Sequence, residues 1–193
     1  MTERVVATLE RRGLGVNVHD LYAENFDPVL RADEAYTSGQ SAEQVLAAGS
    51  DPLLDLHRRE LSAASALVVV HPNWWGKPPA ILAGWMDRVL VPGVAYRLDE
   101  AGGEPESLLS LREVLVFNTS DTTQDREAEL FGDPLESIWL DACRPIWAVL
   151  ESIGSSCAWS PMPTPRSAPA GSPGPKTWPT GYLPQAATWC LGK

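Results

Sequence analysis

The residues with the clearest chemical meaning lie in HPNWWGKPPAILAGWMDRVL, residues 71–90, which directly follows the apolar run ALVVV. Trp74 and Trp75 are adjacent, fall on no helical or strand period, and are bounded by Pro72 and Gly76. Two large rings on a rigid loop suit a flat aromatic ligand, with contacts worth about 0.5–1.5 kcal/mol per pair beyond area burial. Packing of both rings in the core is the alternative that the pattern leaves open.

No second constellation of reactive residues competes with this loop. The sequence has no arrangement typical of a Ser-His-Asp triad or of paired catalytic carboxylates. Its histidines and cysteines are few and scattered, without the spacing of a metal site or a disulfide framework: His19, His57, His71, Cys143, Cys157 and Cys190. We therefore expect no bound metal and no nucleophilic catalysis.

The loop leads into a helix that begins near Pro78 and Pro79, so the first backbone N–H groups of that helix face the same crevice. Gly84 is expected to permit close approach of a neighbouring backbone. The sheet-facing side of this helix is predicted to carry Ile81, Leu82, Trp85 and Val89. Unlike Trp74 and Trp75, Trp85 is therefore expected in the core.

Helix and strand signals alternate along the elements that position this loop. Helices are predicted over 2–13, ending at a glycine, over 41–49, over 51–65, and from Pro134 to about 144. Strands are predicted over 14–22, with Leu14, Val16 and Val18 inward, over 66–70, and over 112–117. Residues 118–127 are expected to form a loop. This alternation predicts an α/β fold with a doubly wound parallel sheet.

Composition limits the class of partner. The chain has 193 residues, 44% hydrophobic and 21% charged, which suits one globular domain. Its net charge of -10 argues against binding nucleic acid or an anionic membrane surface. No apolar run reaches the roughly 18 residues of a membrane-spanning helix, and the start shows no signal-peptide order. We expect a cytoplasmic protein without membrane insertion.

The composition changes towards the end of the sequence. Nine of the 17 prolines fall from Pro145 onward, among Ser, Gly, Ala and Thr. Proline-rich segments of this kind do not form central strands or long helices. The sequence therefore predicts a folded domain over residues 1–154 and a Pro/Ser/Gly-rich, disordered tail over residues 155–193.

The stretch PNWWGKPPAILAGWMDRVLVPGVAY resembles the signature of the flavodoxin-like NAD(P)H:quinone oxidoreductases, and the likeness covers about residues 1–144. The resemblance implies a three-layer flavodoxin-like fold with strand order 2-1-3-4-5. It also implies that the loop after the buried strand, and the loop after the next strand, lie along the ring of FAD or FMN. Carried over by position, these cofactor-binding residues are Pro72, Asn73, Trp74, Trp75, Gly76, Asn118, Thr119, Ser120 and Asp121.

The activity that this family implies is two-electron transfer from NAD(P)H, through the flavin, to a quinone. In such enzymes the cofactor supplies the chemistry and the protein supplies the positioning. Tyr96 matches the aromatic residue that closes over the substrate, and it is the one catalytic candidate. The resemblance also implies a homodimer whose sites are built from both chains.

The sequence departs from the family at both ends, so the fold is expected to be incomplete there. Members begin with a central strand and a phosphate-binding loop that have no counterpart in this sequence, and weak flavin binding is therefore expected. The proline-rich tail replaces their last strand and helix. Two alternatives remain: an ancillary flavodoxin-like subunit of a glutathione-regulated potassium-efflux system, and a non-functional, frameshifted fragment.

Overall fold

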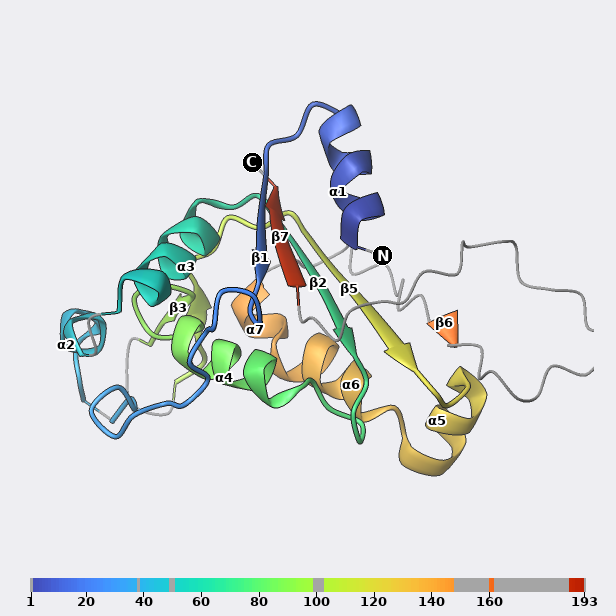
Figure 1. Cartoon of the computed structure of the whole chain (residues 1–193). Helices are drawn as coiled ribbons and strands as arrows, with labels where there is room; N and C mark the ends of the chain where they lie inside the picture. Colours follow the sequence, from blue (N-terminus) through green and yellow to red (C-terminus); the bar gives the residue numbers. More distant parts are fainter. Residues whose placement is uncertain are drawn as a thin grey trace, which may run out of the picture.

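The protein is an α/β structure built on a five-stranded sheet (Figure 1). The computed structural model describes residues 2–37, 39–48, 51–98, 103–147, 160–161 and 188–192. The strand order is β1-β7-β2-β5-β6. In that order the strands span Val16–Asp20, Thr188–Gly192, Ala66–Pro72, Glu113–Ser120 and Ser160–Pro161. The parallel pair β2 and β5 forms its centre, which confirms the predicted fold class.

Helices cover both faces of this sheet. They are α1 (Thr2–Arg11), α2 (Ala42–Ala47), α3 (Pro52–Ala63), α4 (Ala80–Val89), α5 (Gln124–Phe131), α6 (Pro134–Glu136), the π-helix η1 (Ser137–Ala142) and α7 (Arg144–Trp147). Helix α1 packs on one face, and α3, α4, η1 and α7 pack on the other, which gives three layers. A separate two-stranded sheet pairs β3 (Tyr96–Arg97) with β4 (Glu106–Ser107). No described helix is long and apolar enough to cross a bilayer.

The main core lies between the sheet and the α3–α4 layer. Strand β2 is buried along nearly its whole length because helices cover both of its faces, as its continuous apolar run predicts. On α4, Leu82, Trp85 and Val89 are fully buried, whereas Ile81 packs against the core while remaining partly exposed. The predicted stripe and the core position of Trp85 are confirmed.

The segment that follows β1 crosses α4 at very close range. A Cβ atom added to Gly84 would lie 2.1 Å from the carbonyl oxygen of Pro28, so only glycine fits at this crossing. The buried Arg88 side chain donates from Nε and Nη2 to the Glu34 carboxylate at 2.8 Å, and from Nη1 to the Asp27 carbonyl at 2.6 Å. The connection is therefore fixed to α4, and the close backbone approach predicted at Gly84 is confirmed.

The orientation predicted for the first strand is wrong. Leu14 and Val18 are 39% and 46% exposed, whereas His19 is buried. Val16 does pack in the cluster beneath α1. The described part of α1 covers β1 only near Val16. Val18 continues the apolar alternation of the strand but has no described helix over it, and it is therefore exposed. His19 lies on the other face of the strand, towards α3.

Helix α5 lies where a loop was predicted. Residues 124–131 form this helix after Thr123, and Gly132 ends it with a left-handed φ of 69°. Asp125 and Glu127 lie in its first turn, where negative charge favours the helix dipole. The acidic start and terminal glycine were the available signals, but the short, polar segment lacks the apolar periodicity by which helices are usually recognised.

The position expected for the missing first strand, between β1 and β2, holds β7. It pairs antiparallel with both neighbours: Val16 faces Gly192 on one side, and Ala66 faces the same residue on the other. Figure 1 shows this strand, in red, between β1 and β2. The strand order otherwise follows the expected 2-1-3-4-5 pattern. Residues 155–159 and 162–187, most of the predicted disordered tail, lie outside the described residues, and the described strands β6 and β7 fall within that tail.

Candidate functional site

The loop after β2 and the loop after β5 meet at the carboxyl edge of the sheet. Parallel pairing places His71 beside Asn118 and Pro72 beside Thr119. Beyond the last pair, the Asn73 N–H donates to the Thr119 carbonyl at 2.7 Å, which extends the ladder by one bond. The two predicted groups of site residues are therefore brought together, at the edge where parallel sheets bind their ligands.

Trp75 lies at the tip of a tight turn. Trp74 and Lys77 exchange both backbone hydrogen bonds, at 3.1 and 3.3 Å. The two residues between them have positive φ, 60° at Trp75 and 71° at Gly76. Two positive φ values define a type I′ turn, whose first position favours Asn, Asp or Gly. An aromatic residue is strained there, by about 1–3 kcal/mol.

The surrounding structure holds this turn in place. The Asn73 side chain accepts from the Gly76 N–H at 2.9 Å and donates to the Glu127 carboxylate of α5 at 3.2 Å. A Cβ atom on Gly76 would lie 3.0 Å from Cγ of Pro134, so the turn also abuts the start of α6. Strain maintained by such contacts is a common property of functional sites.

The strained turn holds two aromatic rings at the surface. Trp75 is 97% exposed and Trp74 is 38% exposed, although large apolar side chains favour burial. The N–H groups of Asn73, Trp74, Gly76 and Lys77 all donate within the protein. The loop therefore offers a ligand flat apolar surface, and these four N–H groups are not available to an anion.

Asn118 is a buried polar residue at this edge. It is 1% exposed, and neither Oδ1 nor Nδ2 has a hydrogen-bond partner among the described residues. An unsatisfied buried amide costs about 1–3 kcal/mol, and in native proteins such groups often mark a function or an absent ligand. Nearby, the Ser120 hydroxyl accepts from the Thr122 N–H at 3.1 Å, and Asp121 is exposed.

His71, at the end of β2, and Trp139 of η1 are both buried and in contact. The indole N–H of Trp139 donates to Nε2 of His71 at 3.2 Å. An indole can only donate, so the histidine proton must lie on Nδ1, which donates to the Pro72 carbonyl at 2.8 Å. Burial lowers the pKa of His71 from 6.5 to about 4. The imidazole is therefore neutral and fixes the direction in which β2 ends.

Tyr96 does not lie at this edge of its own chain. It lies in β3, half-buried against the main core, and burial raises the pKa of its phenol. Helix α4 separates it from the Trp74–Trp75 turn, and ten helical residues span about 15 Å. Figure 1 shows β3 near α3, whereas α5 and α6 lie towards the other end of α4.

Sequence reasoning missed two groupings of side chains. The π-helix brings Trp139 to His71, and the end of β1 brings His19 to Glu24 and to His57 of α3. Residue spacing could not reveal either, because Trp139 lies 68 residues from His71 and His57 lies 33 residues from Glu24, so these residues meet only through packing. A histidine on a strand otherwise rich in valine was the only signal for each.

Comparison with known proteins agrees with this geometry. Residues 1–143 match a family model described as flavodoxin-like fold. An uncharacterized NAD(P)H oxidoreductase of Haemophilus influenzae is 30% identical over 133 residues, covering 68% of this chain and 60% of the relative. Rat ribosyldihydronicotinamide dehydrogenase [quinone] is 34% identical over 153 residues, covering 72% of this chain and 64% of the relative.

A solved structure gives the same result. The crystal structure of Smu.1420 from Streptococcus mutans superposes with a TM-score of 0.52 at 25% identity, covering 68% of this chain and 64% of that one. The chain thus spans less than two thirds of the length of each relative named here. None of these comparisons supports the ancillary-subunit alternative. Since the family model covers most of the chain and the layers and strand order agree, the protein belongs to this family of flavodoxin-like fold.

Proposed function

We propose that the protein is a flavin-dependent NAD(P)H:quinone oxidoreductase whose flavin ring lies against the turn at Trp74 and Trp75. The observation that carries this proposal is Trp75, an almost fully exposed indole kept at a strained positive φ by a well-anchored turn. Two relatives support the reaction class, because the Haemophilus influenzae protein is described as an NAD(P)H oxidoreductase and the rat protein as a quinone dehydrogenase. The cofactor is FAD or FMN.

The residues at the edge fit the ring of a flavin. Trp74 and Trp75 provide flat apolar surface. The unpaired Asn118 amide has one donor group and one acceptor atom, which complement the alternating carbonyl and N–H groups on the polar side of an isoalloxazine. Pro72, Asn73 and Gly76 hold the first loop, and Thr119, Ser120 and Asp121 extend the second.

A bound flavin would supply the two-electron hydride chemistry that these side chains lack. The protein's task is to hold donor and acceptor against the ring in turn, at about 3–3.5 Å. In this role Trp75 would stack and exclude water, while the neutral His71 and Trp139 keep the end of β2 rigid. A quinone, flat and apolar, is the acceptor that such a surface favours.

A homodimer in the cytoplasm is part of this proposal. Within one chain Tyr96 lies far from the turn, so it can act as the catalytic residue only if a second copy brings it there. The edge also presents the exposed apolar side chains of Leu130 and Phe131 on α5. Sedimentation velocity of the full chain tests the dimer, and a monomer at micromolar concentration would remove Tyr96 from the site.

The proposed activity is tested by oxidation of NADH or NADPH in the presence of a simple quinone and added FMN or FAD. We expect flavin-dependent turnover that falls about two- to tenfold in Trp75→Ala, on the scale of a lost aromatic contact. The matched control is Val29→Ala, which removes another exposed apolar side chain, 62% accessible, from the connection after β1. Turnover without flavin, or equal loss in both variants, would contradict the assignment.

A further inference from the structure

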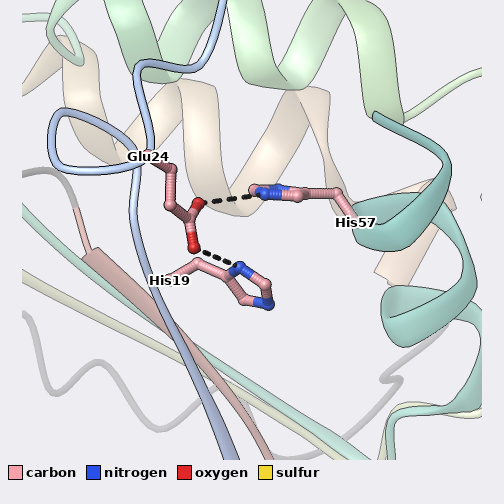
Figure 2. A group of neighbouring side chains, drawn as sticks. All are labelled: His19, Glu24 and His57. Carbon is pink, nitrogen blue, oxygen red and sulfur yellow. Dashed lines mark hydrogen bonds and ion pairs between the residues drawn. The ribbon is translucent and has the colours of Figure 1, made fainter. Parts of the chain in front are cut away.

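Three side chains from separate elements converge beneath the end of β1 (Figure 2). His19 is the fourth residue of β1, Glu24 lies in the turn that follows, and His57 lies in α3. The Glu24 carboxylate bridges the two rings: Oε1 lies 2.8 Å from Nδ1 of His19, and Oε2 lies 3.1 Å from Nε2 of His57. The candidate ligand atoms all lie within 4.8 Å of one another.

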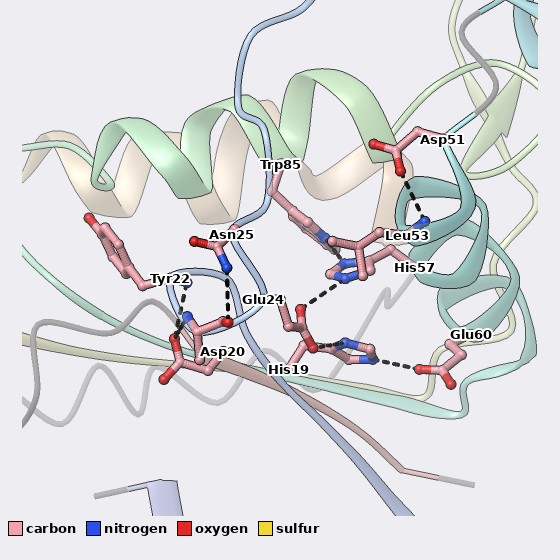
Figure 3. Close-up of polar contacts among 11 residues, drawn as sticks. His19, Asp20, Tyr22, Glu24, Asn25, Asp51, Leu53, His57, Glu60 and Trp85 are labelled. Carbon is pink, nitrogen blue, oxygen red and sulfur yellow. Dashed lines mark hydrogen bonds and ion pairs between the residues drawn. The ribbon is translucent and has the colours of Figure 1, made fainter.

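A second carboxylate supports His19 from behind. Oε2 of Glu60, one turn along α3 from His57, lies 2.6 Å from Nε2 of His19 (Figure 3). A carboxylate that accepts from one ring nitrogen is the usual support of a metal-binding histidine. In the metal-free state Nδ1 of His19 also donates, to Glu24, because a carboxylate only accepts. An ion at Nδ1 displaces that proton, while Glu60 keeps the ring pointed at the place where Glu24 and His57 meet.

The burial of the cluster is uneven, which gives it both rigidity and access. His19 is 5% exposed and His57 is fully buried, with their ring centroids 4.3 Å apart. The side chain of Glu24 is 26% exposed and lies on a turn. The two imidazoles are thus held in place by packing, while the carboxylate between them reaches solvent and can adjust.

Trp85 opposes metal binding at His57. Its indole N–H donates to Nδ1 of His57 at 3.0 Å, so in the metal-free state the His57 proton lies on Nε2 and points at Glu24. An ion at Nε2 requires that proton to move to Nδ1, against the indole N–H. Since Nδ1 accepts from the Trp85 indole, the His57 ring carries a single proton, and metal binding needs only this change of tautomer.

We propose that His19, Glu24 and His57 form a binding site for one divalent transition-metal ion of the Zn²⁺ type. Nδ1 of His19, the Glu24 carboxylate and Nε2 of His57 are its ligands, and Glu60 orients His19. Two imidazoles and one carboxylate form a common ligand set for zinc, with water in the fourth position. Ligand atoms of such an ion lie about 3.3 Å apart, so Glu24 must withdraw slightly when the ion replaces the bridging protons.

The test is a Zn²⁺ titration of the full chain, without a histidine tag and previously stripped with EDTA, followed by calorimetry at pH 7.5. Co²⁺ provides a second probe, because its visible absorption bands report tetrahedral coordination. We expect saturable binding of one ion per chain and tetrahedral Co²⁺ bands. A chain that binds neither ion saturably would overturn the proposal and leave a purely hydrogen-bonded cluster.

Two variants separate a metal site from a structural cluster. Glu24→Gln keeps the size and shape of this partly exposed side chain but removes the ligand charge and one of its two acceptor oxygens, so Zn²⁺ affinity should fall at least tenfold. The matched control is His71→Gln, which changes the third histidine of the chain, outside the cluster, and should leave affinity unchanged. Circular dichroism verifies the fold of each. Equal affinity in Glu24→Gln and the wild type would refute the site.

Trp85→Phe gives a result that a structural role does not predict. Removing the indole N–H releases Nδ1 of His57, so the tautomer that binds the ion is no longer opposed. We expect Zn²⁺ affinity to rise by about tenfold, within the range of effects of outer-sphere partners. Unchanged or weaker binding in a folded Trp85→Phe protein would count against His57 as a ligand.

Discussion

At the scale of single residues, Trp75 is the point where stability and function conflict. Its φ of 60° suits glycine or asparagine, and its ring gains little burial at 97% exposure. We predict that Trp75→Gly raises the free energy of unfolding by about 1 kcal/mol while it weakens flavin binding. Urea denaturation at pH 7.5 measures the first effect.

Gly76 is the control for that prediction. It has a φ of 71°, and an added Cβ would lie 3.0 Å from Pro134. Gly76→Ala should therefore destabilise the protein by about 1–2 kcal/mol. If Trp75→Gly were as destabilising as Gly76→Ala, the ring would be contributing to folding, and its strained position would not indicate function.

Trp85 has the opposite role to Trp75. It is fully buried on α4, and its indole bonds His57. We predict that Trp85→Ala costs about 3–5 kcal/mol of stability, as aromatic core truncations do, and leaves flavin contacts intact in the protein that remains folded. The midpoint of thermal unfolding measures the loss. A change in that midpoint of less than one degree would show that Trp85 does not contribute to core packing.

His71 is predicted to make stability depend on pH. Its pKa is near 4 in the folded state and near 6.5 when unfolded, so the unfolded state binds more protons between these values. Stability is therefore lost as pH falls from about 6.5 towards 4, by roughly 2–3 kcal/mol at pH 4.5. Urea midpoints at pH 7.5, 5.5 and 4.5 measure this loss, and His71→Gln should make the profile less steep, leaving the similar loss that His57 causes. An equally steep profile in that variant would contradict the assignment.

At the scale of elements, the Arg88–Glu34 pair fixes the long connection after β1 to α4. Both side chains are buried, and the pair is bidentate at 2.8 Å. Glu34→Ala leaves Arg88 buried without its main partner, so we expect a loss of about 3–5 kcal/mol. The exposed pair Arg97 and Glu106, 2.7 Å apart, is the matched control, and Glu106→Ala should cost less than about 1 kcal/mol. Similar losses in both variants would contradict this view.

The elements also show how far sequence reasoning reached. The helices over α1, α3 and α4 and the strands β2 and β5 were predictable because apolar periodicity and capping residues act locally. The Ser41 capping box at α2 has the same local origin. Helix α5 was missed because it is short and polar. The exposure of Val18 was not predicted because its burial depends on how much of β1 is covered by α1.

In the candidate site, too, local features could be predicted from the sequence, whereas contacts between distant segments could not. The Trp74–Trp75 loop and its meeting with Asn118 could be predicted, since parallel strands deliver their loops to one edge. The type I′ turn, the unpaired Asn118 amide and the His71–Trp139 contact depend on packing between distant segments. The cluster of His19, Glu24 and His57 has the same cause, and the sequence predicted no metal site there.

At the scale of the whole molecule, β7 joins the two halves of the sheet. It pairs with β1 and β2 over five residues each. A chain ending at residue 187 would leave β1 without its ladder partner and β2 paired only with β5, so we predict a lower melting temperature and concentration-dependent aggregation. Light scattering and thermal unfolding measure these effects. A shortened chain that stays monodisperse with an unchanged melting temperature would show that β1 and β2 do not need this strand.

The central claim is that the carboxyl edge binds a flavin by its ring. The most direct measurement is a fluorescence titration of the full chain with FMN and, in parallel, with lumiflavin, which has the ring but no phosphate. Because the N–H groups of the turn are already used within the protein, we predict weak, saturable binding of both, with dissociation constants above micromolar and within about threefold of each other. Trp75→Ala should weaken both equally. No binding of either ligand, or binding that Trp75→Ala leaves unchanged, would contradict the account.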